Sequence, residues 1–231
     1  MGDVMNNSAA SGAAPAPRGR IRRENETRIL EAAERVFAET GLAGATMAQI
    51  AQAAGLPKAN LHYYFGTKEQ LYQAVLTGIL ELWLDATDMI RPESDPAEAI
   101  SGYVRAKMRH SRHRPLASKV FANELLSGAP FLTDYLEIDL RKRVEAKSRI
   151  IAGWIAEGRM AALDPRHLFF MLWGMTQTYA DFAVQIRAVM EVESLSDAAW
   201  EEATAEVVAF VLRGCGMSTS AASAAPAGAA R

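Results

Sequence analysis

The segment from Thr46 to Phe65 constrains the fold of this chain more than any other part of it. Apolar residues recur at helical spacing from Met47 to Ala54, which predicts a short amphipathic helix. Gly55 can adopt the left-handed conformation that ends a helix, and Pro57 suits the first turn of the next one because its missing N–H costs nothing there. Two short helices joined by such a turn are typical of a helix-turn-helix.

The second of these helices, residues 57–64, is the one that a helix-turn-helix inserts into the major groove of DNA. Lys58, Asn60 and His62 can form hydrogen bonds with base edges or nearby phosphates. Ala59 can contact the methyl group of a thymine. The alternative is a plain helical core, since short amphipathic helices joined through a glycine also occur in proteins that bind no DNA.

A basic stretch precedes this segment. Residues 1–19 are small, polar and proline-containing and end in basic residues, so we expect them to form a disordered arm. The basic positions directly before the first predicted helix are Arg18, Arg20, Arg22 and Arg23. Beside a helix-turn-helix, a flexible arginine arm can neutralise phosphates or enter the minor groove, whereas elsewhere such a run is usually a solvated charge cluster.

The rest of the chain shows helical periodicity and no alternation typical of strands, so we predict an all-α protein of about nine helices. Thr67 and Gln70 have the spacing of a capping box and begin a long helix that Arg91-Pro92 ends. The predicted helices are residues 24–40, 47–54, 57–64, 68–90, 96–112, 115–127, 130–158, 165–190 and 196–213.

The composition favours a cytoplasmic protein with no membrane segment. Cys215 is the only cysteine, so no internal disulfide can form, which fits a reducing compartment. No apolar run reaches the roughly 18 residues that a membrane span requires, and the N-terminus lacks the pattern of a secretion signal. The formal net charge of -2 excludes a surface covered with basic residues, but not a local basic patch.

Three stretches of the first third resemble the N-terminal domain of the TetR family of transcriptional regulators. They are ILEAAERVFAETGL from Ile29, TMAQIAQAAGLPKANLHYYF from Thr46 and GTKEQL from Gly66. The resemblance implies a homodimer that binds a palindromic DNA operator and holds a small molecule in its C-terminal half. We therefore expect a helix-turn-helix domain at residues 20–66, a ligand-binding and dimerisation domain at residues 67–214 and a disordered tail at residues 215–231.

The resemblance also implies which residues hold the DNA backbone. In similar proteins, tyrosines at the end of the second helix and a lysine shortly after it grip the phosphates, and the matching residues here are Tyr63, Tyr64 and Lys68. Lys68 and Thr46 also lie at helix N-termini, whose free N–H groups attract anions. Tyr64 and Phe65 are expected to lie mostly in the core.

Further segments are similar to RutR-type regulators, a group that controls pyrimidine utilisation and responds to uracil and thymine. These segments are NLHYYF, LELWL at residues 80–84, ELLSGAP at residues 124–130, IAGW at residues 151–154 and TQTYADFAVQ at residues 176–185. The resemblance implies a repressor that uracil or thymine releases from DNA. The alternative is a TetR-type repressor of another small molecule, such as an efflux substrate or an acyl compound.

The candidate ligand residues lie on the apolar helix of residues 165–190. Trp173, Gln177 and Asp181 recur at every fourth residue and form one stripe. A uracil ring has a flat face that can stack on a tryptophan, and Gln177 can offer both a donor and an acceptor to its edge. The RutR-type resemblance adds Trp83. In the alternative, both tryptophans are core residues and Gln177 bonds to a neighbouring backbone.

The last two long helices predict a dimer surface. Residues 165–190 and 196–213 carry more apolar residues than one face can bury, although a monomeric core is the alternative. The helix that begins at Lys68 links Trp83 to the DNA-binding domain. A ligand that prefers one spacing of the two DNA-binding domains would therefore change the affinity for DNA.

Nothing in the sequence indicates an enzyme. It has no Gly-rich phosphate loop, no GxSxG motif and no HExxH motif. His110 and His113 lie on a basic helix with no cysteine nearby, and two such histidines are usually solvated. We therefore expect no catalytic residues, no cofactor and no bound metal.

Overall fold

The computed structural model describes residues 18–217, and within that range every regular element is a helix. The all-α prediction is confirmed, with ten α-helices, one 3₁₀ turn and one π-helical segment in place of about nine helices. Most of the two predicted disordered segments lies outside the described residues. The elements are α1 (Arg18–Gly44), α2 (Met47–Ala54), α3 (Lys58–Phe65), α4 (Lys68–Asp85), η1 (Ala86–Met89), α5 (Pro96–His113), α6 (Pro115–Leu126), η2 (Tyr135–Leu140), α7 (Arg141–Ala156), α8 (Pro165–Asp181), α9 (Ala183–Met190) and α10 (Asp197–Gly214).

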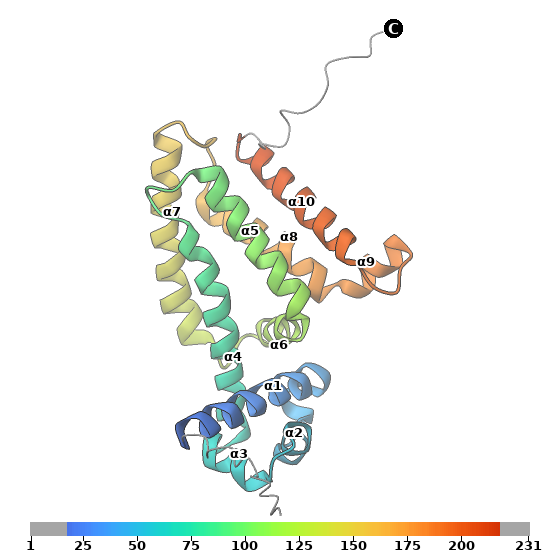
Figure 1. The fold of residues 1–231 in the computed structure, drawn as a ribbon. Coiled ribbons are helices and arrows are strands. Elements are labelled where there is room, and N and C mark those ends of the chain that lie inside the picture. Colours follow the sequence, from blue (N-terminus) through green and yellow to red (C-terminus); the bar gives the residue numbers. More distant parts are fainter. Residues whose placement is uncertain (1–17, 218–231) are drawn as a thin grey trace, which may run out of the picture.

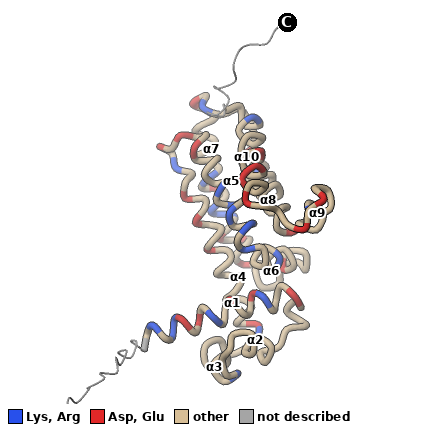
Figure 2. The backbone as a smooth tube through the Cα atoms, turned by 45° about the vertical axis from the view of Figure 1, so that its right-hand side comes forward, with Lys and Arg blue, Asp and Glu red and all other residues tan. Residues whose placement is uncertain are grey.

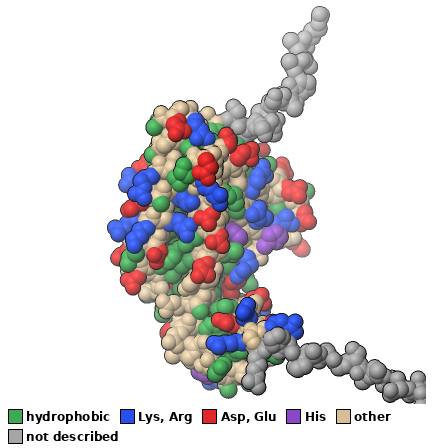
Figure 3. All heavy atoms as spheres, turned by 60° about the vertical axis from the view of Figure 1, so that its left-hand side comes forward, with side chains coloured by type: hydrophobic (Ala, Val, Ile, Leu, Met, Phe, Trp, Pro, Cys, Tyr) green, Lys and Arg blue, Asp and Glu red, His purple; other side chains and the backbone are tan. Residues whose placement is uncertain are grey.

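The helices form a small body and a larger one (Figure 1). The small body consists of α1, α2 and α3 at one end of α4, and the larger body consists of α5 to α10. α6 lies where the two bodies meet and packs on both α1 and α8. Figure 3 shows the two bodies as separate masses joined by a narrower waist.

The core of the small body takes one face from each of its helices and from α4. One large apolar residue from each is fully buried: Ile29, Ile50, Leu61 and Leu71. The ring of Phe37 packs edge-to-face on that of Tyr72, with centroids 4.9 Å apart. Burial of each such side chain stabilises the fold by about 1.5–3 kcal/mol, so Leu61 contributes strongly to holding α3 against the body.

The turn between α2 and α3 forms as its residues predict. The backbone N–H of Gln49 donates to the Thr46 hydroxyl at 3.2 Å, and the backbone N–H of Thr46 donates to the side-chain oxygen of Gln49 at 2.9 Å. These two bonds cap the N-terminus of α2. Gly55 ends α2 in the left-handed conformation, with φ at 62°. Arg28 of α1 donates to the Ala54 carbonyl at 2.8 Å, and so satisfies a carbonyl that the end of the helix leaves free.

The predicted capping box at the start of α4 is confirmed. The backbone N–H of Gln70 donates to the Thr67 hydroxyl at 3.2 Å, and the backbone N–H of Thr67 donates to the side-chain oxygen of Gln70 at 3.1 Å. α4 is shorter than predicted and ends at Asp85. The chain tightens there into η1, where the Thr87 hydroxyl donates to the Leu84 carbonyl at 2.7 Å.

The expectation of a flexible basic arm is wrong for Arg20, Arg22 and Arg23, which lie in the first turns of α1. Arginine is a good helix former, and Arg20 Nε lies 3.4 Å from Glu24 Oε1, an i,i+4 pair that supports the helix. Figure 2 shows the basic residues at the start of α1 and acidic residues following them along the helix. The three arginines are exposed, so a helix presents them to solvent.

Two of the predicted long helices are interrupted. The helix predicted at residues 130–158 contains the π-helical η2 before it continues as α7. The helix predicted at residues 165–190 breaks at Phe182, with φ at −113° and ψ at 29°. Beside this break the Ser118 hydroxyl of α6 donates to the Asp181 carboxylate at 2.5 Å, a tertiary contact that helical periodicity cannot reveal.

The larger body is built around α5, which packs against both α8 and α10. Trp154, Tyr103 and Phe169 are almost completely buried in its core. The indole N–H of Trp154 donates to the Pro92 carbonyl at 3.2 Å, which ties α7 to the loop before α5. Among residues 18–217, no helix is long and apolar enough to cross a membrane.

Polar contacts connect the two bodies. Arg114, between α5 and α6, forms an ion pair with Glu34 of α1 at 2.6 Å. The Tyr72 hydroxyl of α4 donates to the buried Glu124 carboxylate of α6 at 3.1 Å. α6 is therefore bonded to the small body through both α1 and α4.

Candidate nucleic-acid interface and ligand cavity

α3 presents a row of exposed side chains on the outside of the small body. Lys58, Ala59, His62 and Tyr63 are exposed, and Asn60 is half-buried. Tyr63 exposes 75% of its surface, which is a large fraction for an aromatic residue. The residues predicted to contact DNA on this helix therefore share an accessible surface.

Tyr63 and Tyr64 have different surroundings at the end of α3. Tyr64 and Phe65 are half-buried and pack on the core of the small body, in agreement with their predicted placement. The Tyr64 hydroxyl lies 3.5 Å from Asn25 Nδ2 of α1. The Tyr63 ring packs edge-to-face on that of Tyr64, with centroids 5.4 Å apart. Tyr64 thus supports Tyr63, whose exposed ring is available to a partner.

Lys68 and Thr46 both take part in bonds within the protein. Lys68 Nζ donates to the carbonyls of Leu42 and Ala45, at 2.7 Å and 3.0 Å, near the end of α1. An ammonium group has three donors, so one remains for a phosphate. The exposed Thr46 hydroxyl donates to the Gln49 side chain at 2.8 Å. Lys68 therefore also helps to connect α1 with α4, a role that the sequence did not indicate.

A cavity of about 120 Å³ lies in the larger body, between α4, α5, α7 and α8. Three of the predicted ligand residues, Trp83, Trp173 and Gln177, line it. Most of the remaining wall is apolar, with Leu80 and Phe121 as examples. An apolar cavity that contains a few polar groups is typical of small-molecule sites.

Both tryptophans in the cavity are held by neighbouring aromatic residues. The indole N–H of Trp173 donates to the Tyr103 hydroxyl at 2.9 Å, which joins α8 to α5. Burial raises the pKa of Tyr103 to about 12, so its hydroxyl stays neutral. The ring of Trp83 packs edge-to-face on Phe121 of α6, with centroids 4.6 Å apart. Each tryptophan is therefore held in place by a residue from a neighbouring helix.

The structure places the fourth predicted ligand residue, Asp181, away from the cavity wall. Its carboxylate accepts the hydrogen bond from Ser118 of α6. Burial raises the pKa of Asp181, while the Ser118 hydrogen bond and the charge of Lys107 act in the opposite direction. Asp181 thus lies between the α8 wall and α6.

Six polar residues of the cavity were not predicted from the sequence, namely Thr87, Tyr103, Lys107, Tyr135, Arg143 and Lys147. Lys107 is only 3% exposed, and its Nζ lies 4.1 Å from the centroid of the Trp83 ring. It follows Tyr103 by four residues on α5 and so shares its inward face, which the periodicity could have indicated. Tyr135 lies in η2, whose π-helical register differs from the pattern used to predict α-helices.

An apolar surface covers α8, α9, α10 and their connections. Of the fourteen large apolar side chains that are exposed among residues 18–217, eight lie here, a concentration that is unusual on a surface facing only water. This surface, called the α8–α10 surface below, consists of Phe170, Met171, Phe182, Val184, Val189, Met190, Val192 and Phe210. It lies on the helices predicted to form the dimer.

Both halves of the chain match known families. Residues 29–75 match the family described as bacterial regulatory proteins, tetR family. Residues 76–218 match the family described as YcdC-like protein, C-terminal region. The chain is 42% identical over 186 residues to the HTH-type transcriptional regulator RutR of Escherichia coli (strain K12), a match covering 80% of this chain and 88% of that protein.

More distant relatives and solved structures agree. The HTH-type transcriptional regulator BetI of Rhizobium meliloti (strain 1021) is 35% identical over 88 residues, which is 38% of this chain and 43% of that protein. The TetR family transcriptional regulator PfmR from Thermus thermophilus superposes with a TM-score of 0.63 at 25% identity, over 81% of this chain and 95% of that one. The ketosteroid transcriptional regulator KstR2 of Mycobacterium tuberculosis superposes with a TM-score of 0.64 at 23% identity, over 84% and 94%, and shows a shared fold.

The prediction of a regulator instead of an enzyme is confirmed by these matches. The first match contains α2, α3 and the start of α4, and the second contains the cavity and the α8–α10 surface. The chain therefore belongs to the TetR family of DNA-binding transcriptional regulators.

Proposed function

We propose that the protein is a repressor that binds a palindromic operator as a homodimer and leaves it when one pyrimidine ring, uracil or thymine, occupies the cavity. The observation that carries this proposal is the cavity itself, where Trp83, Trp173 and Gln177 meet in about 120 Å³. An engineered apolar cavity of roughly 150 Å³ binds benzene, so this one suits a single six-membered ring. The similarity to RutR-type regulators supports the same ligand class.

The wall of the cavity offers the groups that a pyrimidine ring requires. An indole face can stack on the ring, and the Gln177 amide can donate to a ring carbonyl while its own carbonyl accepts from a ring N–H. Because the Trp173 N–H already donates to Tyr103, the polar contact of α8 with the ring comes from Gln177. Leu80 and Phe121 exclude water from these bonds, which strengthens them.

We assign DNA binding to residues of α3, namely the exposed Lys58, Ala59, His62 and Tyr63 and the half-buried Asn60. Thr46, Lys68 and the arginines at the start of α1 are assigned to phosphate contacts. One such helix covers only a few base pairs, so specific binding requires two copies that face half-sites about one helical turn apart or a multiple of it. The α8–α10 surface supplies the dimer contact that sets this spacing.

The ligand acts by shifting a population between two dimer geometries. α4 carries Trp83 in the cavity near one end and Lys68 at the other, so a displacement of α4 at the cavity is passed along the helix to the small body. α6 provides a second connection through the Ser118–Asp181 and Arg114–Glu34 contacts. The ligand binds one of the two geometries more tightly than the other. The ratio of these two ligand affinities sets the largest factor by which it can change the affinity for DNA.

A repressor of a larger apolar compound, such as an acyl compound or an efflux substrate, is the second candidate. The apolar wall of the cavity suits such a ligand, but a volume of about 120 Å³ does not hold a long chain.

A thermal-shift screen separates the two candidates. Uracil and thymine should raise the midpoint of unfolding in proportion to the logarithm of their concentration, because they bind the folded state alone. A shift with acyl compounds and none with either pyrimidine would refute the pyrimidine proposal.

Tyr63→Ala should weaken binding to every DNA sequence by roughly tenfold or more, because a hydrogen bond to a charged phosphate contributes about 1.5–3 kcal/mol and each copy in the dimer loses one. Stability should not change, since Tyr63 is 75% exposed. Fluorescence anisotropy on an operator and on an unrelated duplex measures both effects. Tyr63→Phe is the matched control, which keeps the ring and should reproduce most of the loss. A changed preference at one base position, with other sequences unaffected, would contradict the phosphate assignment.

A further inference from the structure

The charged residues that line the cavity are all cations. They are Lys107 of α5 and Arg143 and Lys147 of α7, and none of the lining residues is an aspartate or glutamate. A wall of this kind creates a positive potential inside a low-dielectric space, where charges interact more strongly than in water. Carboxylates near these cations determine how much of the positive charge remains.

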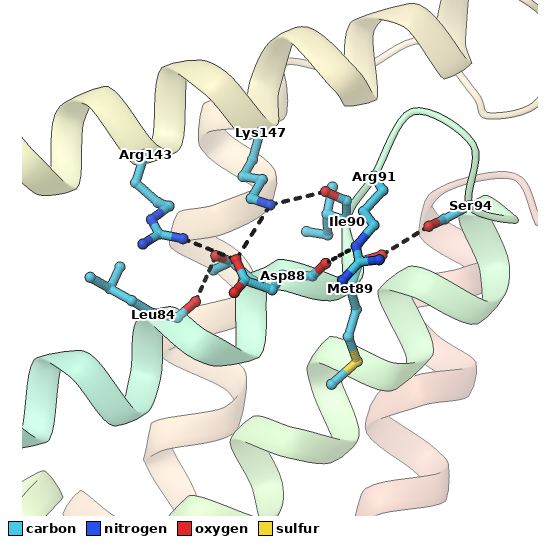
Figure 4. Close-up of polar contacts among 9 residues, drawn as sticks. Leu84, Asp88, Met89, Ile90, Arg91, Ser94, Arg143 and Lys147 are labelled. Carbon is cyan, nitrogen blue, oxygen red and sulfur yellow. Dashed lines mark hydrogen bonds and ion pairs between the residues drawn. The ribbon is translucent and has the colours of Figure 1, made fainter.

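Asp88 of η1 forms ion pairs with both cations of α7 (Figure 4), so its single negative charge is shared between them. Arg143 Nη1 lies 3.0 Å from the Asp88 carboxylate, and Lys147 Nζ lies 3.8 Å from it. Lys147 also donates to the Ile90 carbonyl at 3.1 Å. Figure 4 shows both side chains reaching from α7 toward the Asp88 side chain, so their charges are already partnered.

Lys107 has no such partner. Within residues 18–217, no carboxylate oxygen lies within the 4.0 Å of its Nζ that defines an ion pair. Its contact is with the face of the Trp83 ring. Burial lowers the pKa of Lys107 to about 8, and the charge of Asp181 partly opposes this effect. Asp181 itself is held by Ser118, and so it compensates the ammonium only from a distance.

Tyr135 adds a second unpartnered group on the same wall. Its hydroxyl oxygen is buried and has no hydrogen-bond partner in the described residues. Burial raises the pKa of Tyr135 to about 12, so the hydroxyl remains a neutral donor. It lies in η2, and π-helical turns of this kind frequently occur at functional sites. Within residues 18–217, the Lys107 ammonium thus forms no ion pair and the buried Tyr135 hydroxyl has no hydrogen-bond partner.

We propose that the cavity selects ring ligands that carry a negative charge, with Lys107 bound to the charged oxygen and Tyr135 donating to the same ligand. This inference rests on the proposed function, in which the neutral rings uracil and thymine also bind, and it places anionic rings of the same size above them in affinity. A buried cation without a partner is costly, and an anion that contacts it removes that cost and forms a charge-assisted hydrogen bond. A neutral ring of the same size offers only a carbonyl dipole.

Isothermal titration of the full chain at pH 7 tests this with three probes. Barbituric acid is an anion at this pH, while uracil and thymine are neutral, and thymine matches barbituric acid in size. Barbiturate should bind about tenfold more tightly than thymine, the difference between a charged and a neutral hydrogen bond. If thymine binds as tightly as barbiturate or more tightly, this inference is wrong while the pyrimidine proposal stands. If none of the three binds, both are wrong.

Lys107→Met supplies the second test, because methionine retains an unbranched apolar chain without the charge. The ratio of the barbiturate and thymine affinities should fall from about ten to within about threefold of one. Lys119→Met, an exposed change on α6, should leave the wild-type ratio. Retention of the full ratio in Lys107→Met would overturn the assignment of the charge to Lys107. Should Lys107→Met fail to fold, the wild-type ratio still decides the proposal.

Discussion

Phe210→Glu is expected to convert the protein to a monomer and to lower its affinity for an operator by roughly a hundredfold or more. Phe210 lies on α10, is 62% exposed and belongs to the α8–α10 surface. A carboxylate at this position would have to be buried in the dimer without a partner, which strongly disfavours association. A single α3 then binds without the effective concentration that its linked copy provides.

Light scattering after gel filtration and anisotropy with an operator duplex measure these two effects. Ile138→Glu is the matched control, because Ile138 is also an exposed apolar residue, at 45%, but lies in η2. The control should remain dimeric and bind the operator normally. A Phe210→Glu protein that is still dimeric and binds the operator with unchanged affinity would show that the dimer forms through another surface.

Gln177→Leu is expected to raise the dissociation constant for uracil by roughly a hundredfold, because two hydrogen bonds to the ring edge are lost and its polar groups stay buried without partners. Leucine is similar in size to glutamine, so the cavity keeps its shape and the fold should persist. Operator affinity without ligand should not change, since Gln177 lies in the larger body. The variant should therefore stay on the operator at uracil concentrations that release the wild type.

Gln73→Leu is the control for this substitution, because Gln73 is exposed on α4 and does not line the cavity. It should bind uracil and release the operator as the wild type does. Calorimetry gives the ligand affinities, and anisotropy gives the release. Normal uracil affinity in Gln177→Leu would mean that the ring edge is recognised by other residues, and the assignment of Gln177 would be abandoned.

The small body was predictable because its signals are local. Thr67 and Gln70 are three residues apart, and they cap α4 because the side chain of each accepts from the backbone N–H of the other. Gly55 takes the left-handed conformation that its lack of a side chain permits. Such features depend only on residues that are close together in the chain, so they can be inferred from the sequence alone.

The interruptions of the long helices could not be predicted in this way. The break at Phe182 accompanies a bond between Asp181 and Ser118, which are 63 residues apart. The start of α1 was misassigned for the opposite reason: a local ion pair between Arg20 and Glu24 favours a helix where arginine content suggested a flexible arm. Tertiary contacts and local pairs of this kind outweigh composition.

The candidate cavity was predictable in part. Trp173 and Gln177 share a helical stripe, so their common location followed from spacing, and the structure brings Trp83 of α4 beside them. Asp181 belongs to the same stripe, but its bond to α6 holds it away from the wall. Lys107 could not be assigned to the cavity from its residue type, because lysine is almost always exposed. Only its position on the inward face of α5 indicates that it is buried.

The most direct test of a pyrimidine-released dimer is selection of bound DNA from a random pool, carried out with and without uracil. The account predicts an inverted repeat whose half-sites lie about one helical turn apart, or a multiple of it, and whose enrichment disappears when uracil is present. Enrichment of a single unpaired site, or of an inverted repeat that persists at saturating uracil, would contradict it.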